Sequence, residues 1–76
     1  MKELLSYIAK SLVDHPEAVT VTEHAGVDET VLELRVAPDD MGKVIGRQGR
    51  IAKEIRTLMR SVAQKNGTRV TVEIMD

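Results

Sequence analysis

Hydrophobic residues near the amino terminus recur with helical spacing. They fall on a single side of a helix when the chain turns 100° per residue, and they are Leu4, Leu5, Ile8, Ala9, Leu12 and Val13. Pro16 disfavours helical backbone in the residue before it. The pattern therefore predicts a helix over residues 2–13 that ends at Asp14-His15-Pro16.

The next two segments alternate polar and apolar residues, as strands with one buried face do. Residues 19–22 read Val-Thr-Val-Thr, and residues 30–36 carry Leu32, Leu34 and Val36 at every second position. Val31 stands outside this alternation. Residues 25–29 contain Gly26 and connect the two runs, so we expect an antiparallel hairpin.

The second half of the chain predicts two helices and a strand. Asp39 or Asp40 is placed to cap a short helix over residues 40–46. A longer helix is expected over 50–65, with an apolar side made of Ile51, Ile55, Leu58 and Val62. Asn66-Gly67 is a typical helix stop, and residues 70–75 alternate again as a strand.

The order of these elements indicates an α+β fold in one domain, residues 1–76. Two helices separate the second strand from the third, which favours a parallel crossover over a hairpin. We therefore expect an αββααβ fold with a mixed three-stranded sheet and the helices packed on one face.

Composition narrows the function. The chain has no Cys, two His and a single aromatic residue, Tyr7. Disulfides and cysteine zinc sites are excluded, and so are nucleic-acid modules that stack bases on several aromatic rings. We expect no metal and no cofactor. Neither a signal peptide nor a membrane span is recognisable, so a cytoplasmic location is expected, without membrane association.

The net charge of −1 conceals a strong asymmetry along the chain. Residues 1–41 carry a net charge of −6, whereas residues 42–69 carry +7. A basic stretch of this density on a small fold can form a positive face for a polyanion, or it can be a solvated helix face.

The most informative segment is Gly42-Lys43-Val44-Ile45-Gly46-Arg47-Gln48-Gly49-Arg50. Gly46 and Gly49 bracket a two-residue turn between two predicted helices, and the lack of Cβ atoms lets a sugar-phosphate backbone come close. Free amides and the dipole at the start of the 50–65 helix favour an anion there. Arg47 and Arg50 add guanidinium groups that match phosphate oxygens, and Gln48 can donate a neutral hydrogen bond.

Two other glycine-rich phosphate-binding motifs match this segment less well. A P-loop requires Ser or Thr after Gly42-Lys43, where this chain has Val44. A dinucleotide fingerprint follows a strand, whereas this segment follows a predicted helix. Since no nucleophile is grouped with a base and an orienting residue, we expect neither catalysis nor a small-molecule substrate.

Residues 44–55, Val-Ile-Gly-Arg-Gln-Gly-Arg-Ile-Ala-Lys-Glu-Ile, resemble the V-I-G-x-x-G motif of K-homology (KH) domains. The element order resembles their type II topology over essentially the whole chain. The likeness is strongest to small bacterial proteins made of one KH domain, the KhpA type. In KH domains the G-x-x-G loop clamps the backbone of about four single-stranded nucleotides.

The resemblance implies roles for particular residues. Gly46, Arg47, Gln48 and Gly49 would be the clamp, Ile45 part of an apolar wall, and strand 69–75 a source of backbone groups for base edges, with Arg69 near one end. Lys43, Arg50 and Lys53 lie close enough to the loop in sequence to contact phosphates. Arg56 and Arg60, farther along the helix, are interpreted as a solvated face.

Two functions remain open. The first is a single-stranded RNA-binding protein, which the resemblance implies is an RNA chaperone or post-transcriptional regulator. The resemblance also implies a homodimer or a heteromer with a larger Jag-type KH protein, with a link to cell shape and cell-wall growth. The second is a protein-interaction module whose loop and helix face bind a partner chain instead of RNA.

Overall fold

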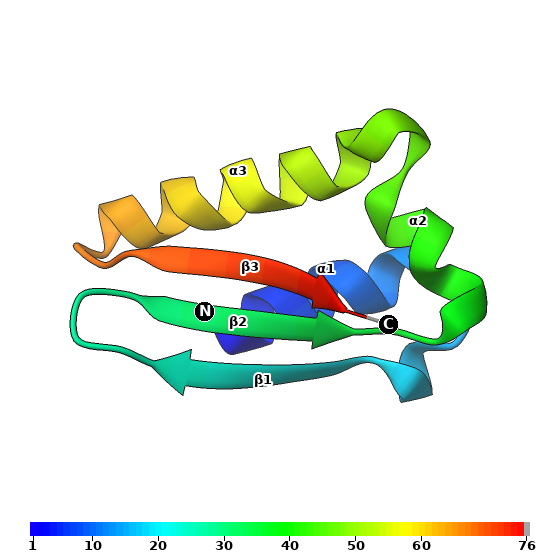
Figure 1. Ribbon diagram of the computed structural model, residues 1–76, viewed down its shortest axis with the longest axis horizontal. Coiled ribbons are helices and arrows are strands. Elements are labelled where there is room, and N and C mark those ends of the chain that lie inside the picture. The colour runs from blue at the N-terminus through cyan, green and yellow to red at the C-terminus, as the bar shows by residue number, and fades with distance from the viewer. Residues whose placement is uncertain (76) are drawn as a thin grey trace.

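The computed structural model describes residues 1–75 and contains six main elements. They are α1 (Lys2–Leu12), β1 (Thr20–Ala25), β2 (Thr30–Arg35), α2 (Met41–Ile45), α3 (Arg50–Lys65) and β3 (Val70–Met75), as Figure 1 shows. The expected αββααβ order is confirmed. Three short 3-10 turns, at residues 16–18, 38–40 and 47–49, were not predicted, and each links two of these elements.

The three strands form the mixed sheet that the crossover argument predicts. β1 pairs with β2 antiparallel, and β3 joins the other side of β2 in parallel. Val21 lies opposite Leu34, and Leu32 lies opposite Val72, so the buried residues of the three strands share one face. Val31 belongs to the opposite face, which explains why it broke the alternation.

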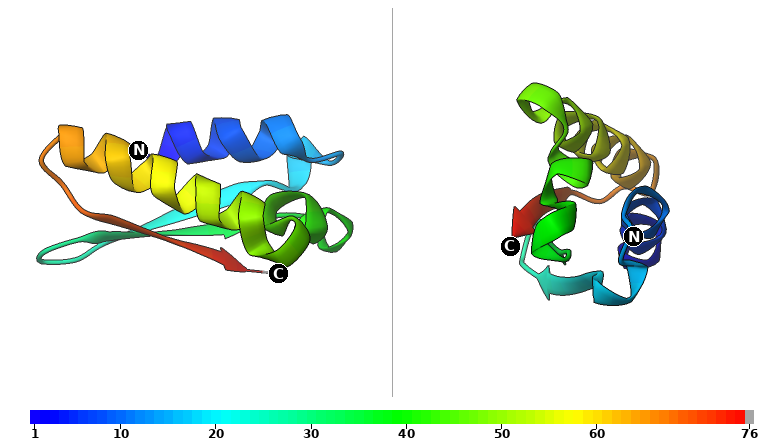
Figure 2. Two further views of the ribbon diagram at one scale, coloured as in Figure 1. Left: turned by 90° about the horizontal axis from the view of Figure 1, so that it is seen from above. Right: turned by 90° about the vertical axis from the view of Figure 1, so that its right-hand side faces the viewer.

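Helices α1 and α3 both lie on that one face of the sheet, and the other face is uncovered (Figure 2). The core between the layers includes Leu5 and Ala9 of α1, Leu32 and Leu34 of β2, and Met59 of α3, all fully or almost fully buried. No helix within residues 1–75 is both long enough and apolar enough to cross a bilayer.

The apolar side predicted for α3 was wrong in part. The buried residues are Ala52, Ile55, Met59 and Ala63, whereas Leu58 is 47% exposed and Ile51 and Val62 are half-buried. The apolar arc of this helix is wider than the surface that the sheet and α1 cover. Two small alanines take part of the buried side, which leaves part of the larger aliphatic side of the helix at the surface.

The carboxyl end of α3 stops where the sequence predicted. The Gly67 amide donates to the Gln64 carbonyl at 3.1 Å, and the Thr68 amide donates to the Ala63 carbonyl at 2.9 Å. Gly67 has a φ of +71°, so these two bonds form a Schellman motif. The motif reverses the chain and places β3 antiparallel to α3, along the edge of the sheet (Figure 1).

Candidate nucleic-acid interface

The predicted glycine-bracketed turn connects α2 to α3 through residues 47–49. Gly46, Gln48 and Gly49 all have positive φ angles, of +77°, +58° and +75°. Three left-handed residues within four positions reverse the chain in a very short distance. Gln48 is the one residue other than glycine within residues 1–75 that has a positive φ, and its side chain is exposed at the tip of the loop.

The two glycines serve different purposes. A Cβ atom at Gly46 would lie 2.6 Å from Cγ1 and 2.9 Å from Cβ of Ile51, so the first turn of α3 packs directly on the Gly46 backbone. A Cβ atom at Gly49 would meet nothing within 4 Å. The space for a close-approaching backbone is therefore at Gly49, whereas Gly46 makes the loop compact.

The loop leaves main-chain donors exposed. The amides of Gly46, Gly49 and Arg50 donate hydrogen bonds to the carbonyls of Gly42, Gly46 and Arg47, respectively. The amides of Arg47 and Gln48 have no acceptor among residues 1–75. Together with the unpaired amides of the first turn of α3, they form a cluster of donors at the positive end of a 16-residue helix.

The two hydrophobic residues before the loop differ in burial. Val44 is fully buried and joins the core, which fixes α2 against the sheet and α1. Ile45 is 36% exposed. The position of Ile45 beside Gly46 is compatible with the apolar wall that the resemblance implied.

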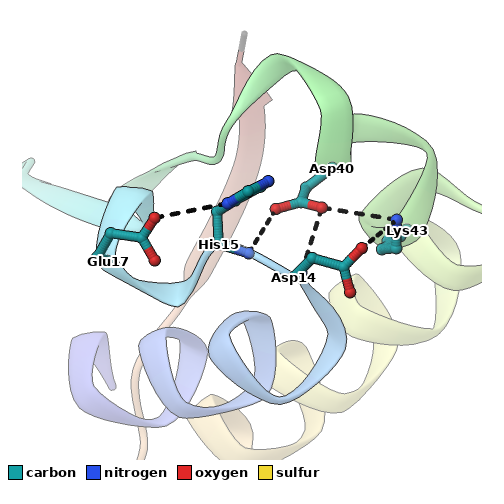
Figure 3. Close-up of polar contacts among 5 residues, drawn as sticks. All are labelled: Asp14, His15, Glu17, Asp40 and Lys43. Atoms are coloured by element: carbon teal, nitrogen blue, oxygen red, sulfur yellow. Dashed lines mark hydrogen bonds and ion pairs between the residues drawn. The ribbon is translucent and has the colours of Figure 1, made fainter.

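A buried carboxylate fixes the start of α2. Asp40 has no exposed surface, and its oxygens accept hydrogen bonds from the amides of Asp14, at 3.2 Å, and His15, at 3.0 Å. Figure 3 shows these contacts, which join the chain after α1 to α2. The prediction was that Asp39 or Asp40 caps this helix. Asp40 does occupy the N-cap position, but no side-chain capping bond is made there, and its carboxylate instead accepts from amides about 25 residues earlier in the sequence.

Lys43 completes this cluster. Its Nζ lies 3.1 Å from Oδ2 of Asp14 and 3.6 Å from Oδ1 of Asp40 (Figure 3). Burial would raise the pKa of Asp40, but the two backbone amides and the charges of His15 and Lys43 outweigh it and hold that pKa below its ordinary value. The hydrogen bond and charge of Asp14 raise the pKa of Lys43 above its ordinary value.

This cluster changes what is expected of Lys43. Its ammonium already contacts two carboxylates, so contact with a phosphate would require it to leave them or to share them. The predicted phosphate contact of Lys43 stays a prediction, but the structure gives Lys43 a role in holding α2 in place.

Two other predicted basic residues, Arg50 and Lys53, lie in the first turn of α3 and have different neighbours. Arg50 borders an apolar hollow beside α1, together with Ile8, Ile51, Glu54, Ile55 and Leu58. Lys53 is exposed and lies three and seven residues before Arg56 and Arg60, so these three share the flank nearer β3. Arg50, three residues before Lys53, adjoins this flank and also borders the hollow beside α1.

Arg69 lies at the start of β3, where a hollow of about 300 Å³ opens between α3 and this strand. Arg56 and Arg60 also line this hollow, and Nε of Arg56 donates to the Val72 carbonyl at 3.2 Å. Both side chains are exposed, which agrees with their interpretation as a solvated face, but the bond from Arg56 to β3 is a contact that the sequence did not predict. Their spacing of three and seven residues from Lys53 was the available signal, but using it required knowing which side of α3 is buried.

Strand β3 exposes part of its backbone at the sheet edge. The Arg69 carbonyl accepts from the Thr30 amide of β2, and main-chain groups in a parallel ladder alternate in direction. The amide and carbonyl of Val70 and Val72 therefore point away from β2. Because Arg56 already occupies the Val72 carbonyl, Val70 offers the freer edge groups for a base.

Comparison with known proteins identifies the relatives of this chain. The family model described as "KhpA/KhpB, KH domain" matches residues 2–74. Proteins named RNA-binding protein KhpA are 60% identical in Clostridium acetobutylicum and 59% identical in Clostridium perfringens, over 99% of this chain and all of each relative. One from Treponema pallidum is 51% identical over 99% of this chain and 94% of its own length.

The fold also occurs inside a larger solved protein. A crystal structure of Era from Aquifex aeolicus aligns with 96% of this chain at a TM-score of 0.65 and 22% identity. The aligned part is 28% of the Era chain. This likeness concerns the fold alone.

Proposed function

Because this chain belongs to the KhpA/KhpB family of KH domains, we propose that it is a single-stranded RNA-binding protein whose G-x-x-G loop grips the RNA backbone. The αββααβ order and the mixed sheet are those of the type II KH fold. The relatives are named for RNA binding, and no enzymatic activity follows from those names.

The observation that carries the proposal is the geometry of the loop. Two amides without an acceptor in the described chain, at Arg47 and Gln48, lie beside the open space at Gly49. Arg47 and Gln48 have exposed side chains, and Arg50 begins the helix behind them. A phosphate at this corner would receive main-chain hydrogen bonds, the favourable end of the helix dipole and guanidinium charge together.

We assign Lys43, Ile45, Gly46, Arg47, Gln48, Gly49, Arg50, Lys53 and Arg69 to this interface as a proposal. Gly46 acts through the shape of the loop, because its face is covered by Ile51. Lys43 acts chiefly by holding α2 through Asp14 and Asp40. Arg50 is exposed between the loop and the apolar hollow beside α1 that it also borders.

The deciding experiment replaces the two central loop residues. Arg47→Asp with Gln48→Asp places two carboxylates on the proposed phosphate path, and Asp tolerates the left-handed backbone of position 48 better than most residues. We expect fluorescence anisotropy to show no binding of single-stranded RNA, with an unchanged circular dichroism spectrum.

The matched control is Lys10→Asp with Ser11→Asp, which changes the charge equally at exposed positions of α1. This control should retain RNA affinity. Two or three phosphate contacts also predict that log K for the wild-type chain falls with log salt at a slope of about −1.4 to −2. Unchanged RNA affinity in the loop variant would contradict the proposal.

We further propose that the chain self-associates or joins a larger Jag-type KH protein. It acts in the cytoplasm as an RNA chaperone or post-transcriptional regulator, and this activity is linked to cell shape and cell-wall growth. One clamp binds weakly, and joining two clamps raises the effective affinity. The apolar hollow beside α1 supports this pairing, because Ile8, Ile51 and Leu58 line it and Leu58 is 47% exposed.

This hollow also favours the second candidate function, an interaction module that binds a partner chain. Leu58→Glu should lower the mass measured by light scattering if the hollow is an association surface, whereas Thr57→Glu, one residue away and also exposed, should not. RNA affinity that is unchanged in the loop variant, combined with loss of association in Leu58→Glu, would favour the interaction module over RNA binding.

A further inference from the structure

The hollow between α3 and β3 lies toward the opposite end of α3 from the G-x-x-G loop. Its lining comes from α3 beyond its first turns, from residues 68–72 and from Glu29 of the β1–β2 turn. Figure 1 shows these three segments meeting where α3 turns back into β3. At about 300 Å³ it can admit a nucleotide-sized group.

The charges that line this hollow are mostly positive. Arg56, Arg60 and Arg69 contribute three guanidinium groups, against the single carboxylate of Glu29. That carboxylate is already used, since its Oε2 accepts from the Thr71 hydroxyl at 2.8 Å. None of the three arginines forms an ion pair with a carboxylate of residues 1–75. The hollow therefore has unneutralised cationic groups, which is the chemistry of an anion site.

The three arginines differ in whether a hydrogen bond holds their side chains in place. Arg56 is anchored by the bond from its Nε to the Val72 carbonyl, which leaves its terminal nitrogens free to donate. Arg60 and Arg69 approach from two different elements, α3 and the start of β3. Two guanidinium groups that approach from separate elements can bind one phosphate between them.

The hollow continues the proposed RNA interface along the same flank of α3. Lys53, Arg56 and Arg60 follow one another on that flank from the loop end toward the hollow. Arg60 is eleven residues beyond Gly49, about 16 Å along a helix that rises 1.5 Å per residue. A strand stacked at 3.4 Å per nucleotide would need about five nucleotides to cover that length.

We propose that this hollow is a second phosphate-binding subsite for RNA, in which Arg60 and Arg69 hold a backbone phosphate several nucleotides away from those at the loop. The inference rests on the proposed function and extends it: the footprint becomes longer than the four nucleotides of one loop clamp. The continuous basic flank favours RNA as the occupant over an acidic protein segment.

The test compares two lengths of the same RNA. Arg60→Gln with Arg69→Gln removes both charges and leaves the anchored Arg56 in place. The probes are a tetranucleotide and a decanucleotide of uridine. We expect the variant to bind the decanucleotide about tenfold more weakly, with the magnitude of the salt slope lower by about 1.4, because two contacts contribute about 0.7 each. Affinity for the tetranucleotide should fall much less, because Arg60 lies beyond the loop clamp and Arg69 stands at the far end of the interface assigned to it.

The control is Lys2→Gln with Lys10→Gln, which removes equal charge from exposed positions of α1 and should retain decanucleotide affinity. Equal weakening for both lengths, or unchanged decanucleotide affinity, would overturn the subsite. If the loop variant loses all RNA binding while Arg60→Gln with Arg69→Gln loses none, the subsite fails and the proposed function stands. If wild-type protein binds neither probe, the proposed function fails. Loss of poly-glutamate binding in the variant, with RNA affinity intact, would overturn the subsite in favour of an acidic protein partner.

Discussion

The contact between Gly46 and Ile51 predicts that the two loop glycines differ in how far they tolerate alanine. Gly46→Ala places a methyl group 2.6 Å from Cγ1 of Ile51, and one of its contacts is Cβ of Ile51, which cannot move without the helix backbone. The residue also has a φ of +77° and a ψ of 176°, a region that is essentially restricted to glycine. Gly49→Ala meets open space and has an ordinary left-handed backbone, with a φ of +75° and a ψ of 15°.

The magnitudes follow from these geometries. The disfavoured backbone at position 46 costs about 1–3 kcal/mol, and forcing a methyl into a packed contact costs about 1–3 kcal/mol more. At position 49 the left-handed backbone alone costs about 1–2 kcal/mol. A domain of this size has a free energy of unfolding of about 4–11 kcal/mol. Gly46→Ala should therefore remove a large fraction of the stability, and Gly49→Ala a small one.

Urea unfolding followed by circular dichroism measures both losses, and a double-mutant cycle isolates the steric part. Ile51→Ala removes two of the three side-chain atoms that the new methyl would meet, Cγ1 and Cδ1, and leaves Cβ. Gly46→Ala should therefore cost less in an Ile51→Ala background, by part of the about 1–3 kcal/mol of the packed contact. A cycle that uses Gly49→Ala with Ile51→Ala should show additive losses. Equal losses for the two single glycine variants, or no coupling between Gly46 and Ile51, would refute the contact as the reason for glycine at position 46.

Three further outcomes are expected. The pKa of Asp40 in the fold lies below its ordinary 3.8, so the ionised carboxylate stabilises the fold above pH 3.8. This stabilisation is lost as the pH falls further. Asp40→Asn should therefore be less stable at neutral pH, and its acid-unfolding profile, followed by circular dichroism, should be flatter. The pKa of Lys43 is raised above 10.5, so its contribution is present below that pH and is lost above it, and Lys43→Met should flatten the alkaline limb. Gly67 has a φ of +71° and open space around it, so Gly67→Ala should lower the free energy of unfolding measured in urea by about 1 kcal/mol. An unchanged free energy of unfolding would contradict the Schellman motif as a stabilising element.

The arrangement of the fold was predictable because its local signals agree. The helix over 50–65, its stop at Asn66-Gly67 and the alternation of Leu32 and Leu34 each specify one element. Two helices between the second and third strands then require a parallel crossover. Hydrophobic periodicity did not predict which side of α3 is buried, because Ala52 and Ala63 carry little hydrophobic signal and yet are buried.

The loop was also predictable, since spacing alone places Gly46 and Gly49 between two helices. The contacts of its supporting residues were not. Asp40 is linked to the amides of Asp14 and His15, about 25 residues away, and no local pattern specifies a pairing at that separation. The identity of Asp40 as a short polar residue before a helix suggested a cap, but burial gave it a long-range partner instead.

The placement of charge in the fold explains why the net charge of −1 does not argue against a polyanionic ligand. Glu33 and Glu73 lie opposite each other in adjacent strands, on the sheet face that no helix covers. Lys53, Arg56 and Arg60 lie on a flank of α3, which packs on the other face. Arg35 shares the open face with these two carboxylates, so that face carries little positive charge. A phosphate backbone is attracted instead to the α3–β3 side, where the loop amides are also exposed. The same number of charges spread evenly would give neither attraction nor orientation, so it is their separation by the fold that makes this nearly neutral chain suited to bind one strand of RNA along one side.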